Sequence, residues 1–485
     1  MSSSPSFFGP SASSRRHFLA KNALGISSLA SAWLLNREGL LAQPKPSLEQ
    51  VTYDLLPKRP IEAPRAQAMI SIFTGGGPSH LDLFDYKPAL EKYAGQQFPG
   101  KDIKYDNAGQ ATSIVMPSKW KFNRRGECGM EINDTLLPHF AEITDEVTLI
   151  RSMNLPNIRN HVAGMRALTT GRGPEGWPSL GSWITYGLGA ESQNLPAFVA
   201  LVLGGNPPGS PFWDSRHLPS VYQGTIVRET EPRIANLRPP MHLRGEAQKN
   251  QLGLLDKLNR DHLAELPGED DLSARIASYE LAARMQTEAT DALDLSRESE
   301  ATKKLYGLDD PTTQRMGEAC LLARRLVERG VRFVQIWNYG WDMHENLFAA
   351  LEGACAKADK PAAGLVKDLK GRGLLDSTIV QWGGEMGRLP VVQNRGAGRE
   401  PGRDHNTEGF SLWMAGGGLK KGHIHGATDE FGHRAVQDIV TQHDFHCTLL
   451  RQFGLDPDSL TYQHSGQSVA LVEKGQGSVV DGILA

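Results

Sequence analysis

The sequence predicts an α/β protein whose doubly wound, mostly parallel sheet has helices on both faces. Three observations support this prediction: the apolar runs are short, glycine-rich turns follow several of them, and helical segments alternate with them. Strands of a parallel sheet are buried on both faces, so they read as short, continuous apolar runs. The 51 glycines and 29 prolines also indicate many ordered loops, which suits a site built from loops.

Six segments are expected to form the strands. The first is followed by three glycines at 75–77, and another leads directly to Gly383 and Gly384. A helix expected over 316–329 ends before Gly330, where the next strand begins. The expected strands are 68–73, 147–150, 197–202, 331–336, 377–380 and 410–414.

Two stretches depart from this pattern. Residues 95–135 are polar and weakly periodic, which indicates an excursion near the sheet edge, whereas residues 244–310 are charged and helical and predict an inserted cap. A long loop at 205–243 leads into the cap. The expected order is a signal at 1–42, a linker at 43–65, an α/β domain at 66–465 with the insertion at about 205–310, and a tail at 466–485.

The N-terminus has the features of a twin-arginine export signal. Paired arginines lie within Ser14-Arg15-Arg16-His17-Phe18-Leu19, and an apolar stretch follows at 23–35. That stretch is about 13 residues long, too short for a membrane-spanning helix of roughly 20 residues. Small residues near Ala30, Ala32 and Ala42 offer cleavage sites. We therefore expect a removable signal, passage through the twin-arginine translocase, and a periplasmic or secreted protein, the alternative being an ordinary basic N-terminus.

Charge and cysteine content exclude some functions. Residues 1–42 hold four basic residues and one acidic residue, so their removal changes the formal net charge from −3 to −6, which argues against nucleic acid as the main partner. No later segment is long and apolar enough to span a bilayer. The four cysteines form no CxxC pair, and so few in a chain of this length predict no disulfide framework.

Polar residues that can perform chemistry follow the expected strands. In a parallel sheet the carboxyl ends of the strands lie at one edge, where ligands bind. We therefore expect a composite site at this edge, although an acid or histidine after a single strand is common. The five clusters lie at 75–85, 160–172, 341–346, 383–388 and 403–406.

The first cluster offers a hydroxyl, an imidazole and carboxylates. Ser79 is a candidate catalytic residue, and His80 and Asp82 are candidate metal ligands. The alternative is a glycine-rich connector whose aspartates cap the next helix, and Asp85 is assigned to that capping or turn role.

The other clusters add two candidate catalytic residues. His161 is expected to open a helix, whose N-terminus favours an anion; the alternatives are a cap or a packed core histidine. Arg388 offers a cation suited to oxyanions. The remaining polar residues can bind a cation, because carboxylates and imidazoles together hold divalent metals, Zn²⁺ where nitrogen ligands dominate and Ca²⁺ or Mn²⁺ otherwise. The candidate metal ligands are His80, Asp82, Asp342, His344, Glu385 and His405.

Five motifs in a fixed order resemble a known bacterial family. They are GGGPSHLDLFDYKP, NHVAGMRALTTGRG, GWDMHENL, GGEMGR and GRDHN. Together they resemble domain-of-unknown-function family 1501 from about residue 66 to 460. Members look like relatives of the sulfatase and alkaline phosphatase superfamily, often with twin-arginine signals. The resemblance implies a doubly wound sheet with metal and catalytic residues on loops at one edge.

The resemblance also implies roles for particular residues. Asp342 with His344, then Glu385, and then His405 match the order of the superfamily's metal-holding residues, and the resemblance implies that Asp82 with His80 replaces the acid after the first strand. Sulfatases carry a modified Cys or Ser at the start of a helix that ends like Leu168-Thr169-Thr170-Gly171-Arg172. His161 lies at that starting position, so the usual sulfatase nucleophile is absent, and the arginine usually found nearby is shifted to Arg166.

Two functions from different classes follow. The first is an exported, metal-dependent hydrolase of phosphate or sulfate esters, in which Arg388 neutralises the oxyanion and His161 acts as acid, base or covalent carrier. The second is a non-catalytic exported protein that keeps a metal and binds a sulfated glycan or a partner. A transferase or mutase that uses the same site is a third, weaker interpretation.

Overall fold

The computed structural model describes residues 53–485 apart from 101–102, 107–110, 205–211, 236, 238–240, 266–269 and 394–398. The expected export signal and the first part of the expected linker lie outside the described residues. Within the described part of the chain, no helix is long and apolar enough to cross a membrane.

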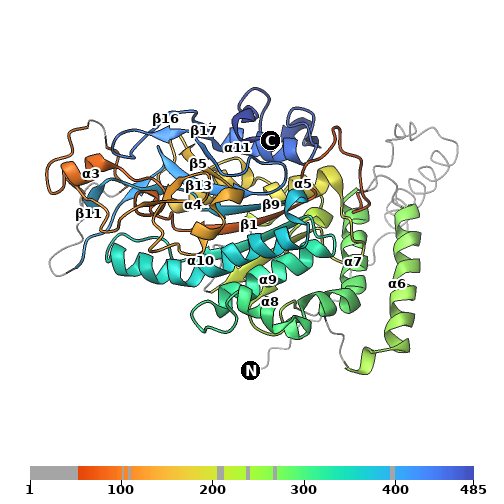
Figure 1. The fold of residues 1–485 in the computed structure, drawn as a ribbon. Coiled ribbons are helices and arrows are strands. Elements are labelled where there is room, and N and C mark those ends of the chain that lie inside the picture. The colour runs from red at the N-terminus through yellow and green to blue at the C-terminus, as the bar shows by residue number, and fades with distance from the viewer. Residues whose placement is uncertain are drawn as a thin grey trace, which may run out of the picture.

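A nine-stranded mixed sheet forms the centre of the molecule (Figure 1). Its strand order is β14-β5-β13-β9-β1-β8-β6-β7, and β17 pairs with β5. All six expected strands are present, and the expected α/β class is confirmed; the short strands β7, β14 and β17 were not expected. The strands are β1 (Ala68–Gly75), β5 (Val147–Asn154), β6 (Phe198–Leu203), β7 (Thr225–Arg228), β8 (Phe333–Tyr339), β9 (Thr378–Gly383), β13 (Phe410–Ala415), β14 (His423–His425) and β17 (Val440–Thr441).

Strand β13 runs against the rest of the sheet. It pairs antiparallel with both β5 and β9, whereas β1 pairs parallel with β8 and β9, and β6 pairs parallel with β8. The start of β13 therefore lies at the edge where the parallel strands end. For this reason residues that precede β13 reach the same edge as residues that follow β1, β8 and β9.

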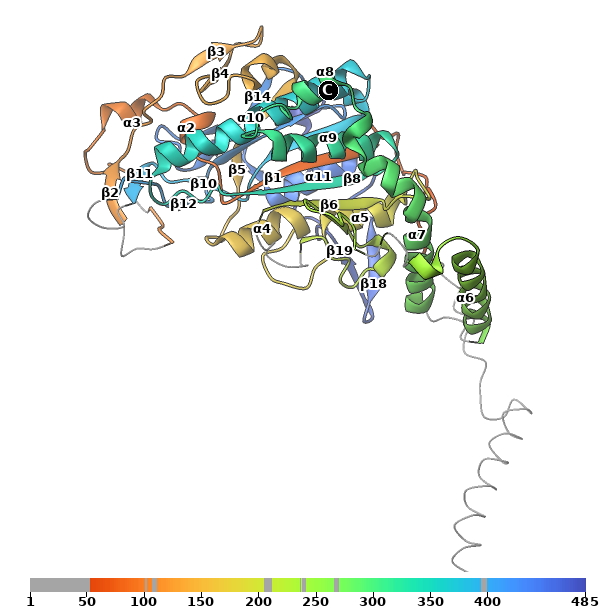
Figure 2. The same cartoon turned by 90° about the horizontal axis from the view of Figure 1, so that it is seen from below.

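Helices cover both faces of the sheet (Figure 2). Helices α9 (Gln314–Glu328) and α10 (Leu347–Gly371) lie on one face, and α4 (His161–Thr170) and α5 (Leu180–Leu188) lie on the other. Every residue of the central strand β1 is buried, as expected for a strand covered on both sides. Helix α11 (Gln442–Gln452) follows β17 and begins with a capping box of Thr441 and Asp444.

Shorter helices and strands lie outside the central sheet and its covering helices. The polar excursion at 95–135 contains a hairpin of β3 and β4, and β2, which pairs with β11. The last residues of the chain are joined to the domain by backbone hydrogen bonds, among them one from Lys420 to Ile483. The short elements are α2 (His80–Leu83), α3 (Pro88–Lys92), β2 (Ala111–Val115), β3 (Asn123–Arg125), β4 (Met130–Ile132), β10 (Gly387–Arg388), β11 (Val391–Gln393), β12 (His405–Asn406), β15 (Ala427–Thr428), β16 (Ala435–Gln437), β18 (Thr461–His464) and β19 (Gln467–Ala470).

The charged segment at 244–310 holds α6 (Glu246–Glu265), α7 (Asp270–Leu293) and α8 (Glu300–Leu305), and α6 stands off from the body (Figures 1 and 2). A buried arginine of α9 ties the end of this segment to the core. Arg324 is 1% exposed and forms ion pairs with Glu298 at 2.8 Å and with Asp368 of α10 at 3.0 Å. The permanent charge of Arg324 is therefore matched by carboxylates from two other elements.

Replacing Arg324 should destabilise the fold strongly. We expect Arg324→Leu to lower the free energy of unfolding by about 3–5 kcal/mol, because the variant removes the buried cation shared by two largely buried carboxylates, which then keep only Arg325 and Arg372 as charged partners. Chemical denaturation of the mature chain measures this. Arg297, which is 71% exposed and pairs with Asp291, provides the control, since Arg297→Leu should cost less than about 1 kcal/mol. Equal losses in the two variants would contradict the structural role of Arg324.

Candidate metal centre

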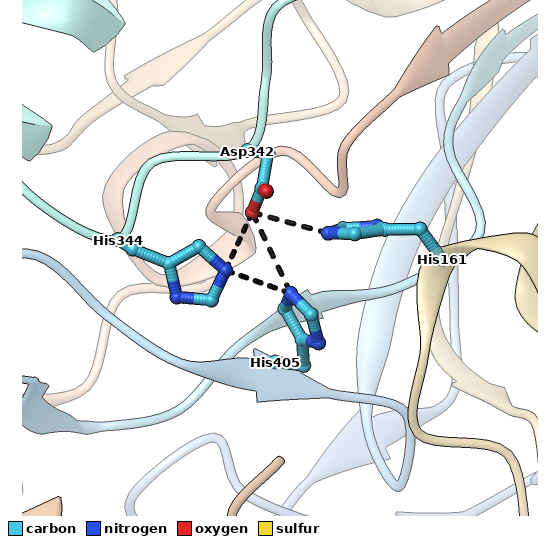
Figure 3. A group of neighbouring side chains, drawn as sticks. All are labelled: His161, Asp342, His344 and His405. Carbon is cyan, nitrogen blue, oxygen red and sulfur yellow. Dashed lines mark hydrogen bonds and ion pairs between the residues drawn. The ribbon is translucent and has the colours of Figure 1, made fainter. Parts of the chain in front are cut away.

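Four side chains converge at the edge where the parallel strands end (Figure 3). They are His161, Asp342, His344 and His405, and one ligand atom of each lies within 4.8 Å of the other three. His161 is the first residue of α4, Asp342 and His344 follow β8, and His405 lies in β12, before β13. The structure thus brings together residues that lie up to 244 positions apart.

The spacing of these atoms suits one small divalent cation. Asp342 Oδ1 lies 2.8 Å from Nε2 of His344, 3.1 Å from Nε2 of His161 and 3.5 Å from Nε2 of His405. The Nε2 atoms of His344 and His405 are 2.9 Å apart. Ligands held about 2.0–2.1 Å from a tetrahedral zinc ion lie about 3.3 Å from one another, so small movements would produce such a shell.

The other ring nitrogen of each histidine faces an acceptor outside the cluster. Nδ1 of His161 donates to Glu385 Oε1 at 2.6 Å, and Nδ1 of His405 donates to the carbonyl oxygen of Arg159 at 2.9 Å. Nδ1 of His344 donates to the side-chain oxygen of Gln393. Because each Nδ1 carries the ring proton in the neutral imidazole, each Nε2 presents a lone pair to the centre.

Lone pairs and a carboxylate that face one another require a positive charge between them. His161 Nε2 is buried and has no hydrogen-bond partner among the described residues, although Asp342 Oδ1 lies 3.1 Å away. This nitrogen faces Asp342 at the centre of the cluster, where it can present a lone pair to a cation or, when protonated, an N–H to the carboxylate. The residues present therefore fit a divalent cation, and three nitrogen ligands favour Zn²⁺ over Ca²⁺ or Mn²⁺.

In the metal-free protein a proton supplies part of this charge. Burial lowers the pKa of His161, but the carboxylates of Asp342 and Glu385 outweigh it and raise the pKa to about 9. Partial burial opposes the ionised form of Asp342, yet the surrounding histidines and Arg388 hold its pKa well below the usual range. Burial lowers the pKa of His405, which favours its neutral form. His161 is thus an imidazole whose proton a cation must displace.

Backbone geometry brings the loops close together. Gly76, in the turn after β1, has a φ of +114°, and a Cβ placed there would lie 2.4 Å from the backbone nitrogen of Asp342. Only glycine allows this approach. At the other side, Asn160 caps α4 by accepting a hydrogen bond from the backbone nitrogen of Ala163 at 2.9 Å, which fixes His161 in the first turn.

Two expected site residues contact the cluster without being among its four converging side chains: Glu385 contacts His161, and Arg388 contacts Asp342. Glu385 is completely buried, and its Oε1 accepts hydrogen bonds from Gly76 N at 3.0 Å and from His161. Glu385 was expected to be a metal ligand, but it contacts the cluster through His161. Its remaining oxygen, Oε2, is buried without a hydrogen-bond partner among the described residues.

Arg388 was expected to meet a substrate oxyanion, and its contacts differ from that expectation. Its side chain is completely buried, with Nη2 donating to Asp342 Oδ1 at 2.7 Å, Nε to the carbonyl oxygen of Gly77 at 2.9 Å and Nη1 to that of Arg403 at 3.1 Å. All three nitrogens thus serve protein acceptors. Arg388 holds Asp342 and the adjoining loops in place.

Ser79, His80 and Asp82 do not join the cluster. The chain turns into α2 directly after the loop that follows β1, and this short helix is buried. His80 Nε2 donates to the carbonyl oxygen of Gly432 at 2.8 Å, while Nδ1 accepts from Arg388 N at 3.4 Å. Asp82 pairs with buried Arg403 at 3.0 Å and accepts from Ser79 Oγ at 2.5 Å. In this structure the polar atoms of these three side chains contact protein partners outside the cluster.

Sequence reasoning missed the partners that orient two of the histidines. Gln393 lies in β11, 49 positions after His344, and nothing in its sequence context marks it. Asp404 accepts a hydrogen bond from the backbone nitrogen of His405 at 2.9 Å, and its place next to that histidine was the available signal. The third partner, the carbonyl oxygen of Arg159, could not be predicted from the sequence, because every residue has a backbone carbonyl.

The fold and the cluster define the class: an α/β protein with a candidate divalent-metal site at the carboxyl edge of its sheet. The chain belongs to the family described as protein of unknown function (DUF1501), which matches residues 66–484 and confirms the family suggested by the five motifs. No curated protein sequence matches the chain.

Solved structures resemble the chain only distantly. The PsFucS1 sulfatase from Pseudoalteromonas sp. is 12% identical, with 81% of this chain and 68% of that chain covered and a TM-score of 0.34. The lipoteichoic acid synthase LtaP from Listeria monocytogenes is 9% identical, with 87% and 77% covered and a TM-score of 0.35. Alkaline phosphatase from the Antarctic bacterium TAB5 is 8% identical, with 73% and 92% covered and a TM-score of 0.30. Likenesses this weak do not carry a functional assignment.

Cation binding should depend on pH through His161. Because the metal-free site holds the proton of His161 up to about pH 9, the affinity for Zn²⁺ should rise about tenfold per pH unit between pH 7 and 9 and then level off. Competition with a coloured chelator at several pH values measures this. An affinity that stays constant over that interval would contradict the assignment of the proton to His161.

Proposed function

We propose that the protein is an exported, metal-dependent hydrolase of phosphate or sulfate esters. The observation that supports it most is the convergence of three Nε2 atoms and one carboxylate oxygen, with the Asp342 side chain 43% exposed to solvent. Asp342, His344 and His405 would hold the cation. When bound, a divalent cation supplies a Lewis acid that polarises an oxygen of an anionic ester.

An anionic substrate suits the charges around the cluster. A divalent cation exceeds the single negative charge of Asp342, so the loaded centre attracts an anion. The N-terminus of α4 also favours negative charge, and it begins at His161 itself. With Nδ1 committed to Glu385, His161 can accept a proton at Nε2 from the attacking water, which is the role of a general base.

A non-catalytic metal- or glycan-binding protein of the same fold is the second candidate. It is favoured by the number of converging atoms, because four protein ligands close a tetrahedral shell, as structural zinc sites do. Catalytic zinc sites keep a position free. The two candidates therefore differ in whether His161 binds the cation or faces it.

Hydrolysis can be tested with aryl phosphates, phosphodiesters and aryl sulfates in the presence of Zn²⁺, Mn²⁺ or Ca²⁺. We expect turnover of at least one class, and we expect His405→Ala to reduce it at least about 100-fold because the cation loses a ligand. His139→Ala is the control, since that histidine is 40% exposed and pairs with Glu142, outside the cluster. No turnover with any metal would leave the binding protein as the better proposal.

The proposed route of export predicts when the metal is acquired. The residues of the cluster span positions 161–405 and meet only on folding, and twin-arginine substrates are typically folded before transport. We expect replacement of Arg15 and Arg16 by lysine to retain a folded precursor in the cytoplasm that carries its metal. Cell fractionation with metal analysis measures this. Normal export of the variant, or a folded precursor without metal, would contradict the proposal.

A further inference from the structure

Glu385 is a completely buried carboxylate at the back of the cluster. It follows β9 and lies between the turn after β1 and the first turn of α4. Its Oε1 accepts two hydrogen bonds, one from the backbone nitrogen of Gly76 and one from Nδ1 of His161. Burying a charge is costly unless an opposite charge or hydrogen bonds compensate it. The buried carboxylate of Glu385 is compensated by its hydrogen bond to the His161 imidazole, which can carry a positive charge.

The hydrogen bond from His161 to Glu385 fixes which ring nitrogen carries the proton. A carboxylate can only accept, so Nδ1 must donate, and the Nε2 lone pair is left facing Asp342. The bond also fixes the direction of the ring. Without it, the ring could rotate or place its proton on Nε2, where it would meet the cation.

We propose that Glu385 is the positioning residue of the metal centre: by binding Nδ1 of His161 it fixes the ring so that Nε2 is the nitrogen that faces the cation. This inference rests on the proposed metal site and deepens it. Glu385 touches neither the cation nor the substrate and acts through His161. Hydrogen bonds of this kind raise the basicity of an imidazole toward a metal, and their loss typically weakens metal affinity 10–100-fold.

Helix α4 approaches closely enough to make this contact because residue 164 is glycine. A Cβ placed at Gly164 would lie 3.1 Å from both Cβ and Cγ of Glu385, which is tighter than ordinary van der Waals contact. An alanine there would push the helix and the Glu385 side chain apart by a few tenths of an ångström. Gly164→Ala is therefore a steric probe of the same contact that leaves every charge in place.

The test measures zinc affinity and the state of the His161 ring in the mature chain. We expect Glu385→Gln to weaken Zn²⁺ binding at least tenfold, because the amide keeps an acceptor for Nδ1 but loses the charge. We also expect the proton resonance of His161 Nδ1, assigned by its loss in His161→Ala, to move upfield in the variant. Glu352→Gln is the matched control, since that glutamate is 50% exposed and pairs with Lys119; its affinity should equal that of the unmodified protein.

A double-mutant cycle separates positioning from general stability. If Glu385 acts through His161, then Glu385→Gln should have no further effect on Zn²⁺ affinity in a His161→Ala background. An equal loss in both backgrounds, or affinity within twofold of the unmodified protein with an unchanged Nδ1 resonance, would overturn the proposal. Should Glu385→Gln fail to fold, Gly164→Ala decides: weakened Zn²⁺ binding supports the proposal and unchanged binding overturns it.

These readouts also distinguish this inference from the proposed hydrolase. A protein that binds Zn²⁺ through the Glu385–His161 pair but hydrolyses no ester defeats the hydrolase and leaves the positioning role intact. If the protein hydrolyses an ester but its Zn²⁺ affinity is unchanged in Glu385→Gln, only the positioning role is contradicted. A protein that binds no Zn²⁺ defeats both.

Discussion

The outward hydrogen bonds of three imidazoles decide what this site can bind. His161, His344 and His405 each direct Nδ1 to an acceptor outside the cluster, so their Nε2 atoms face one another and Asp342. Such an arrangement of acceptors is unfavourable unless a proton or a metal ion lies between them. The fold therefore has to supply not only the ligands but also the acceptors behind them.

A single buried guanidinium holds the loops that carry this arrangement. Arg388 reaches Asp342, the turn at Gly77 and the backbone of Arg403, which belong to the ends of β8 and β1 and to the segment before β13. A buried charge is stable only when its surroundings satisfy it. Loss of one of these acceptors would leave the buried guanidinium with fewer hydrogen bonds, so Arg388 makes the loop positions interdependent.

Much of the fold could be predicted from the sequence, because parallel strands give short apolar runs that end in glycine-rich turns. The same pattern predicted which edge of the sheet carries the candidate site. It also led to the prediction of Asp342, His344 and His405 as metal ligands. The antiparallel direction of β13 was not readable, although it is what brings His405 to that edge.

The sequence could not separate ligands from the residues behind them. His80, Asp82 and Glu385 have the right chemistry and follow strands, but whether they face the centre depends on how tightly the turns after β1 and β9 pack. The buried helix α2 directs His80 and Asp82 to Gly432 and Arg403. His161 was assigned to catalysis from its place at a helix start, and only the distances show that it shares the cluster with the three other residues.

The most direct measurement is a crystal structure of the zinc-loaded protein with anomalous diffraction recorded at the zinc edge. We expect one zinc peak about 2.0–2.2 Å from Asp342 and from the Nε2 atoms of His344 and His405. We also expect Nδ1 of His161 to stay hydrogen-bonded to Glu385. A zinc peak beside His80 and Asp82, or none within reach of His405, would contradict the proposed metal centre.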